Sequence, residues 1–205
     1  MPVPLLIPDR TGLEQAAELL RGGAVIGFPT DTVYGLAALA RDERALLRVY
    51  AVKGRSPSQP LILMPPSTQS LSGWAAIDGR AQAVMRRWWP GPLTLILPAE
   101  SGIPPPLSSG TPPAIGVRIP DHPVARALLD VVGEPLATTS ANRSGLPPAL
   151  TALAAAGLDG LGAVLDGGSA PGGVPSTLLD LSRARPRLLR TGPITATDLG
   201  LAQRA

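Results

Sequence analysis

The sequence predicts an α/β fold in which helices pack against a β-sheet. Apolar runs of strand length alternate along the chain with amphipathic runs of helical period, which is the pattern of layered α/β domains. Apolar residues make up 44% of the 205 residues, enough for a full core, although only 3% are aromatic. The 23 glycines and 25 prolines fall between the periodic segments, so we interpret them as loop residues. A chain of this length is expected to form one domain.

The first half of the chain predicts two helices and three strands. A helix over residues 11–21 is indicated by a capping box in which Thr11 and Glu14 satisfy the first turn. Asp42 is expected to cap a second helix with an apolar stripe. The strands are expected at residues 24–28, 36–39 and 61–64.

The same alternation continues in the second half. Helices are expected at residues 80–89, 124–132 and 150–156, and strands at 93–97, 115–119, 136–140, 163–165, 177–181 and 188–190. Residues 98–113 form a proline-rich loop, which is either part of the surface or a mobile lid. His122, between two prolines, is interpreted as a residue at the start of a helix.

The composition excludes several kinds of chemistry. Without cysteine there are no disulfides, thiolate nucleophiles or cysteine-bound metals, and with His122 as the only histidine there is no two-histidine metal site. The P-loop, Rossmann and G-x-S-x-G signatures are also absent. Lys53 is the only lysine among 18 basic residues, so it is the one amine available from a side chain.

The sequence favours a cytoplasmic protein without a membrane partner. No apolar stretch approaches the roughly 18–20 residues of a membrane span, and the N-terminus lacks the pattern of a signal peptide. A net charge of +3 is weak support for nucleic-acid binding, since basic residues cluster only at Arg86 and Arg87 and over residues 183–187.

Polar clusters follow predicted strands or helices at four places, and α/β proteins bind ligands at strand ends. The first, residues 29–35, contains Thr32 and Tyr34 and is either a plain turn or part of a site. The second begins with Lys53 and Arg55, two cations that can converge on one phosphate. The alternative is that these cations only complement the negative end of a helix dipole.

The third and fourth clusters add an arginine and a run of hydroxyl groups. Arg118 lies in an otherwise apolar strand, so its guanidinium must reach solvent or meet an anion, and a substrate carboxylate would suit it. Residues 138–145 include Thr138, Ser140 and Asn142, which together could bind the phosphates or base of a nucleotide. A serine- and asparagine-rich segment is also common in loops without such a role.

In their order and spacing, these clusters resemble the YrdC family. The segments that carry the resemblance are residues 28–36, 53–55, 60–62, 89–94, 116–123, 139–145, 175–177 and 189–192. The resemblance implies an open, twisted, mixed β-sheet flanked by helices, with a basic concave cavity. It also implies a single domain over residues 1–205 with a core at about 10–194 and no additional C-terminal domain.

Catalytic members of this family are nucleotidyltransferases. The resemblance implies that the chain uses ATP, L-threonine and bicarbonate or CO₂ to make threonylcarbamoyl-AMP and pyrophosphate, with Mg²⁺ assisting and no resident metal site. A separate transferase complex would then use this product to modify tRNA, to which the chain itself would bind only weakly. A reaction of this type depends on positioning and electrostatics more than on covalent catalysis.

The resemblance also implies roles for individual residues. Lys53 and Arg55 would be catalytic, since they would hold the ATP phosphates and offset the charge on departing pyrophosphate. Further contacts to ATP would come from Gln59, Ser140, Asn142 and Arg190. The threonine site would be formed by Thr32, Tyr34, Arg118, Thr138 and Ser176.

The sequence departs from some family members at one position. Those members have a histidine in the strand after the Lys-x-Arg motif, where this chain has Leu63 and Met64.

The alternative function is a non-catalytic RNA-binding protein of the same fold. Two features favour the enzyme: the cations stand singly among hydroxyl groups, and aromatic residues that could stack on bases are scarce.

Overall fold

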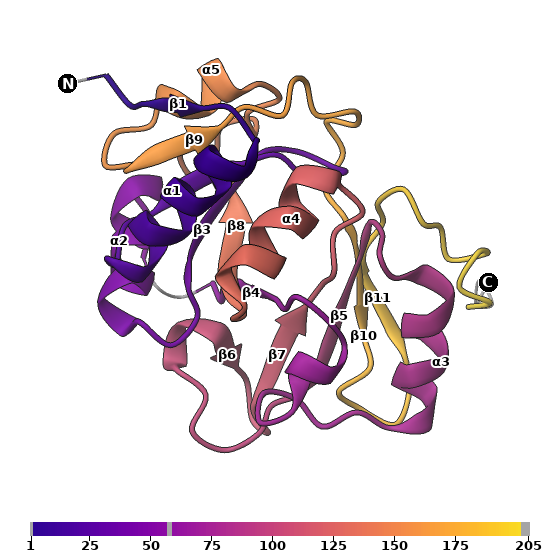
Figure 1. Cartoon of the computed structure of the whole chain (residues 1–205). Helices are drawn as coiled ribbons and strands as arrows, with labels where there is room; N and C mark the ends of the chain where they lie inside the picture. The colour runs from indigo at the N-terminus through magenta and orange to yellow at the C-terminus, as the bar shows by residue number, and fades with distance from the viewer. Residues whose placement is uncertain (1, 57–58, 202–205) are drawn as a thin grey trace.

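A computed structural model describes residues 2–56 and 59–201 of the chain (Figure 1). The helices among these residues are α1 (Arg10–Arg21), α2 (Glu43–Lys53), α3 (Gly79–Trp88), α4 (Pro123–Val132) and α5 (Ala152–Ala156), with short 3₁₀ helices η1 (Gln69–Leu71) and η2 (Pro105–Leu107). The strands are β1 (Leu5–Leu6), β2 (Ile26–Phe28), β3 (Gly35–Leu39), β4 (Ile62–Met64), β5 (Leu93–Pro98), β6 (Ser108–Ser109), β7 (Ala114–Val117), β8 (Leu136–Ser140), β9 (Ala163–Leu165), β10 (Thr177–Asp180) and β11 (Arg187–Arg190).

The described strands form one mixed, open sheet. Its order is β1-β9-β2-β3-β8-β4-β7-β5-β10-β11, and β6 pairs with β7 off this path. Strand β8 is antiparallel to both β3 and β4, while β10 is parallel to β5 and antiparallel to β11. This order brings the start of β3, the end of α2 and the end of β8 to one region, although they are far apart in the sequence.

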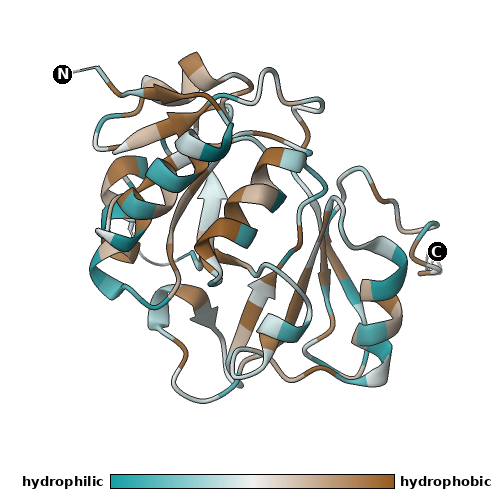
Figure 2. Cartoon of the chain, viewed as in Figure 1, coloured by the Kyte–Doolittle hydropathy of each residue, from teal (hydrophilic) through white to brown (hydrophobic). Residues whose placement is uncertain are grey.

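Successive strand residues point to opposite faces of the sheet and enter two separate cores. On one face, α1 and α4 pack against each other and cover Ile26, Ala37 and Leu136 (Figure 1). On the other, α2 contacts β3 and joins the larger core, which includes Leu63 and Leu95. Brown, hydrophobic segments run along the central strands in Figure 2, and teal, hydrophilic segments lie on the turns of α1 and α3.

The start of α1 corrects one sequence expectation. The predicted capping box of Thr11 and Glu14 is wrong: Asp9 is the N-cap, and its Oδ1 accepts a hydrogen bond from the backbone N–H of Gly12 at 2.9 Å. Because Asp9 is as good a cap as threonine, the helix begins one residue earlier, and Glu14 pairs with Arg10 instead. The N-cap roles expected of Asp42 in α2 and of His122 in α4 are confirmed.

The proline-rich segment 98–113 packs against the body of the domain. It contains η2 and β6, its Leu107 is fully buried, and the Leu61 N–H donates to the carbonyl of Pro106 at 2.8 Å. Residues 98–113 contribute no lining to the cavity described below. Among the described helices, none combines the length and apolar character needed to cross a bilayer.

Candidate functional site

A cavity of about 550 Å³ lies on the sheet face that α1 and α4 cover elsewhere, and we call it the central cavity. The side chains that point to this face alternate with core residues along each strand, so the floor holds Ile62, Thr94, Ile96, Thr138 and Leu178. All eleven residues that the sequence assigned to the site line this cavity: Thr32, Tyr34, Lys53, Arg55, Gln59, Arg118, Thr138, Ser140, Asn142, Ser176 and Arg190.

Lys53 is the last residue of α2, which ends there because Gly54 adopts a left-handed conformation. The side chain is 2% exposed, and its Nζ donates to Ser140 O (2.6 Å), Asn142 O (3.0 Å) and Asn142 Oδ1 (2.9 Å). All of these partners are neutral oxygens. Burial, and secondarily Arg55, lower the pKa of Lys53 to about 8. Lys53 is therefore a buried cation to which the described residues supply no anionic partner.

Arg55 and Gln59 form the outer wall near Lys53. The Arg55 guanidinium donates to Gln59 Oε1 at 2.8 Å and to the Gln59 carbonyl at 3.1 Å, and it lies over the ring of Tyr50. These contacts hold a second positive group at the same rim of the cavity. Two cations close together in a partly desolvated space attract a polyanion such as a triphosphate.

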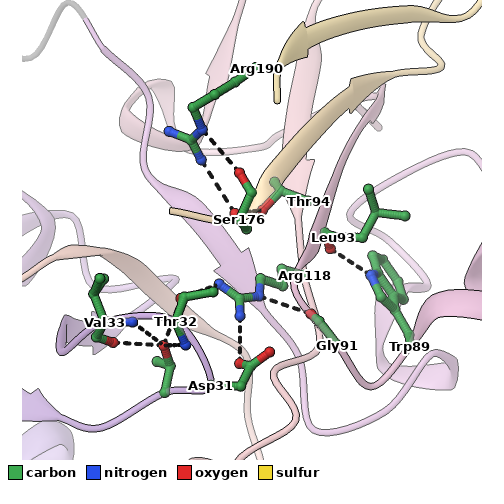
Figure 3. Close-up of polar contacts among 11 residues, drawn as sticks. Asp31, Thr32, Val33, Trp89, Gly91, Leu93, Thr94, Arg118, Ser176 and Arg190 are labelled. Atoms are coloured by element: carbon green, nitrogen blue, oxygen red, sulfur yellow. Dashed lines mark hydrogen bonds and ion pairs between the residues drawn. The ribbon is translucent and has the colours of Figure 1, made fainter. Parts of the chain in front are cut away.

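Arg118 follows β7 directly and is only 4% exposed, so the solvent-facing alternative is wrong. Its Nε donates to Gly91 O (3.1 Å), Nη1 to Thr32 Oγ1 (3.0 Å) and Nη2 to Asp31 Oδ1 (2.5 Å), as Figure 3 shows. Burial lowers the pKa of Arg118, and Asp31 opposes that effect. A guanidinium has five N–H groups, so two remain available for a ligand in the cavity.

The end of β8 supplies a second set of fixed polar groups. Ser140 Oγ donates to Asn142 Oδ1 at 2.6 Å, and Asn142 Nδ2 donates to the carbonyl of Leu146 at 2.7 Å. Thr138 lies two residues before Ser140 on the same face of β8, and its hydroxyl donates to the carbonyl of Ile62. The loop after β8 is thus held in one conformation by its own side chains and by Lys53.

Ser176 and Arg190 meet on the opposite wall. Arg190 Nε donates to the carbonyl of Ser176 at 3.0 Å, and its Nη2 donates to Ser176 Oγ at 3.3 Å (Figure 3). Desolvation lowers the pKa of Arg190. Tyr34, from the first cluster, is fully buried, and its hydroxyl donates to the carbonyl of Gly168 at 2.6 Å.

Sequence reasoning missed two partners of these residues. Asp31 lies in the first polar cluster, residues 29–35, without a predicted role, yet it is the carboxylate that pairs with Arg118. Thr94 lies in the segment 89–94 that carries the family resemblance, without a predicted role, and it lines the cavity beside Ser176. The signal for Thr94 was a hydroxyl residue in a strand whose next residues on the same face are apolar.

A second cavity of about 530 Å³ lies between η1, α3 and α4. Its lining includes Gln82, Arg86, Trp89 and Arg126 and none of the predicted site residues. In the described part of the chain, no group of three or more histidine, cysteine or acidic side chains is placed to hold a metal ion. The central cavity is therefore the candidate site, and its polar groups are cations, hydroxyls and amides.

A family model that covers Sua5, YciO and YrdC proteins, described as telomere recombination, matches residues 18–192. The chain belongs to the Sua5/YciO/YrdC family. It is 41% identical over 190 residues to the threonylcarbamoyl-AMP synthase of Bacillus subtilis, covering 91% of this chain and 55% of the relative. It is 37% identical over 171 residues to the synthase of Chromohalobacter salexigens, covering 82% of this chain and 92% of the relative.

Solved structures of the Sua5/YciO/YrdC family have the same fold. Pyrococcus abyssi Sua5 complexed with L-threonine matches with a TM-score of 0.89 at 35% identity, over 97% of this chain and 60% of that one. Escherichia coli YciO matches with a TM-score of 0.84 at 28% identity, over 95% of this chain and 97% of that one. The chain spans about half the length of the Bacillus and Pyrococcus relatives it matches.

Proposed function

We propose that the chain makes threonylcarbamoyl-AMP from L-threonine, bicarbonate or CO₂, and ATP, with release of pyrophosphate. Relatives at 37% and 41% identity are named threonylcarbamoyl-AMP synthases, and one similar structure is a complex with L-threonine. The observation that carries the proposal is that Lys53 and Arg118, two buried cations from distant parts of the chain, line one cavity with every other predicted contact.

The two cations suit different parts of the substrates. Hydrogen bonds to Asp31, Thr32 and Gly91 fix the orientation of the Arg118 guanidinium. Its two remaining N–H groups would bind the threonine carboxylate. Lys53 and Arg55 would bind the triphosphate, with Ser140, Asn142, Gln59 and Arg190 as further contacts. Mg²⁺ would arrive with ATP as part of the substrate, bound to its phosphates.

The reaction then needs no covalent intermediate on the protein. The threonine nitrogen adds to CO₂ and loses a proton, which forms a carbamate. A carbamate oxygen attacks the α-phosphorus of ATP, the new O–P bond forms, and the bond to pyrophosphate breaks with the electrons leaving on pyrophosphate. The fixed positive charges of Lys53 and Arg55 would stabilise the charge that builds on the leaving group. The product would be passed to a tRNA-modifying transferase.

Pyrophosphate release tests this function. The chain is incubated with ATP, Mg²⁺, bicarbonate and L-threonine, and mass spectrometry identifies the adenylate. We expect release to depend on threonine. Lys53→Ala and Arg118→Ala should each lower kcat/KM at least about 100-fold, since each removes a charged contact from a desolvated site. Arg10→Ala, which removes an arginine whose side chain is 91% exposed, is the control and should match the wild type.

Two results would contradict the proposal. Pyrophosphate release that is independent of threonine would exclude this synthase reaction. Wild-type rates in both variants would show that the central cavity is not the site. Salt-sensitive RNA binding by a protein that does not release pyrophosphate would instead support the RNA-binding alternative.

A further inference from the structure

Thr94 is a buried hydroxyl in the wall of the central cavity with no role in the scheme above. It lies in β5, is 1% exposed, and its Oγ1 is 2.8 Å from Oγ of Ser176 (Figure 3). Ser176 precedes β10, and the neighbouring Thr177 pairs with Leu93 on β5. The pairing of β5 with β10 therefore brings the two hydroxyls together, Thr94 from within β5 and Ser176 from the residue just before β10.

Either hydroxyl of this pair can donate in the 2.8 Å contact, and the difference in burial between the two residues favours one arrangement. Among the described residues, the Oγ1 of Thr94 has a hydrogen-bond contact only with Ser176. A buried O–H without an acceptor costs about 1–3 kcal/mol, and Thr94, 1% exposed, is more deeply buried than Ser176, 6% exposed, so the arrangement in which Thr94 donates to Ser176 Oγ is favoured. That oxygen also accepts from Arg190 Nη2, which occupies its second lone pair.

The hydrogen of Ser176 is then the one group of the pair left without a partner in the described part of the chain. Ser176 lines the cavity, so in this arrangement its hydrogen is available to a ligand bound there. With both lone pairs occupied, Ser176 can donate a hydrogen bond to a ligand but cannot accept one. The Ser176 hydroxyl therefore favours a ligand with an acceptor oxygen beside it and disfavours a ligand with an N–H group there.

We propose that Thr94 is a positioning residue for amino-acid selectivity, because it fixes Ser176 as a donor to the side-chain hydroxyl oxygen of the bound amino acid. This inference rests on the proposed function. The carboxylate of threonine is assigned to Arg118 and its nitrogen carries the carbamate, so the side-chain hydroxyl oxygen is the polar group of threonine that still needs a partner. Thr94 thereby contributes to recognition of a β-hydroxy amino acid without touching it.

The test compares two ligands that differ only in this hydroxyl. Wild type, Thr94→Val and Thr94→Ser are titrated by calorimetry with L-threonine and with L-2-aminobutyrate. Valine keeps the shape of Thr94 and removes its hydroxyl, whereas serine keeps the hydroxyl. In Thr94→Val we expect affinity for threonine to fall about 3- to 10-fold, the loss of one neutral hydrogen bond, with affinity for 2-aminobutyrate unchanged. Thr94→Ser should keep the wild-type preference for threonine. In turnover assays, Thr94→Val should raise KM for threonine with little change in kcat.

An equal loss for both ligands in Thr94→Val would indicate a merely structural role and overturn the inference. Unchanged selectivity would also overturn it. If Thr94→Val does not fold by circular dichroism, Thr94→Ala is used with the same criteria. The proposed function fails separately: wild-type protein that neither binds threonine nor releases pyrophosphate in its presence would overturn both, whereas failure of the Thr94 variants alone leaves the synthase proposal intact.

Discussion

The two buried cations of the central cavity are compensated in different ways. Arg118 has the carboxylate of Asp31 at 2.5 Å, so part of its charge is neutralised within the protein. Lys53 is surrounded by the backbone and amide oxygens of Ser140 and Asn142, which orient the ammonium without cancelling its charge. Of these two cations, Lys53 therefore keeps the less compensated charge, which would suit the triphosphate of the proposed substrate.

This difference predicts a pH dependence of ATP binding. The pKa of Lys53 is lowered to about 8, so its ammonium is charged below that value and becomes neutral above it. ATP affinity, measured without threonine, should therefore fall as pH rises from about 7 to 9.5. Lys53→Met should bind ATP more weakly at neutral pH and lack this step. Arg55→Gln is the matched control, because it removes the neighbouring cation at the same rim and leaves Lys53 in place, so the step should remain. A step of the same size in Lys53→Met would contradict the assignment.

At the scale of elements, the site depends on how the hairpin of β10 and β11 is closed against the sheet. Gly192, just after β11, donates its N–H to Thr177 Oγ1 at 3.0 Å, and the same hydroxyl donates to the carbonyl of Ile194. A Cβ atom at Gly192 would collide with backbone atoms of Pro175, Ser176 and Thr177. The segment after Arg190 can therefore approach Ser176 only because this residue has no side chain.

Gly192→Ala should separate Arg190 from Ser176. The added methyl group meets backbone, which cannot move aside as a side chain can, so we expect a loss of about 1–3 kcal/mol in the free energy of unfolding and weaker ATP binding. Urea denaturation and calorimetry measure the two effects. Gly79→Ala is the control, because its Cβ would have no atom within 4 Å, and it should retain both properties. Wild-type stability in Gly192→Ala would show that the hairpin has another way to close.

The sequence predicted the helices and central strands within a few residues, because hydrophobic period and caps are local signals. It did not predict β1, which has two residues and depends on pairing with β9, or the order of strands in the sheet. At the site, the family resemblance named residues that do line one cavity. The pairing of Arg118 with Asp31 and the contact of Thr94 with Ser176 were out of reach, since each joins segments more than 80 positions apart.

For the whole molecule, the central cavity joins residues from Thr30 to Arg190, so ligands that bind it should stabilise the entire domain. At a concentration 100-fold above Kd, a ligand adds about 2.7 kcal/mol, which for a domain of this size raises Tm by roughly 5–10 °C. Mg·ATP should raise Tm, and threonine should raise it further. In Arg118→Gln the added effect of threonine should disappear while that of Mg·ATP remains. Loss of neither effect, or of both, would show that Arg118 does not bind threonine selectively.

The position of β10 and β11 after the other strands of the cavity in chain order has a consequence for synthesis on the ribosome. Ser176 and Arg190 leave the ribosome after every other wall of the central cavity, and β10 must then pair with β5, some 80 residues earlier. A nascent chain can begin to pack α1, α2 and the central strands, because domains start to fold from the N-terminus during translation. It still lacks Ser176 and Arg190, and with them one wall of the cavity. The central cavity is therefore complete only after residue 190 has emerged, and in a chain truncated before residue 176 the cavity would be open on that side.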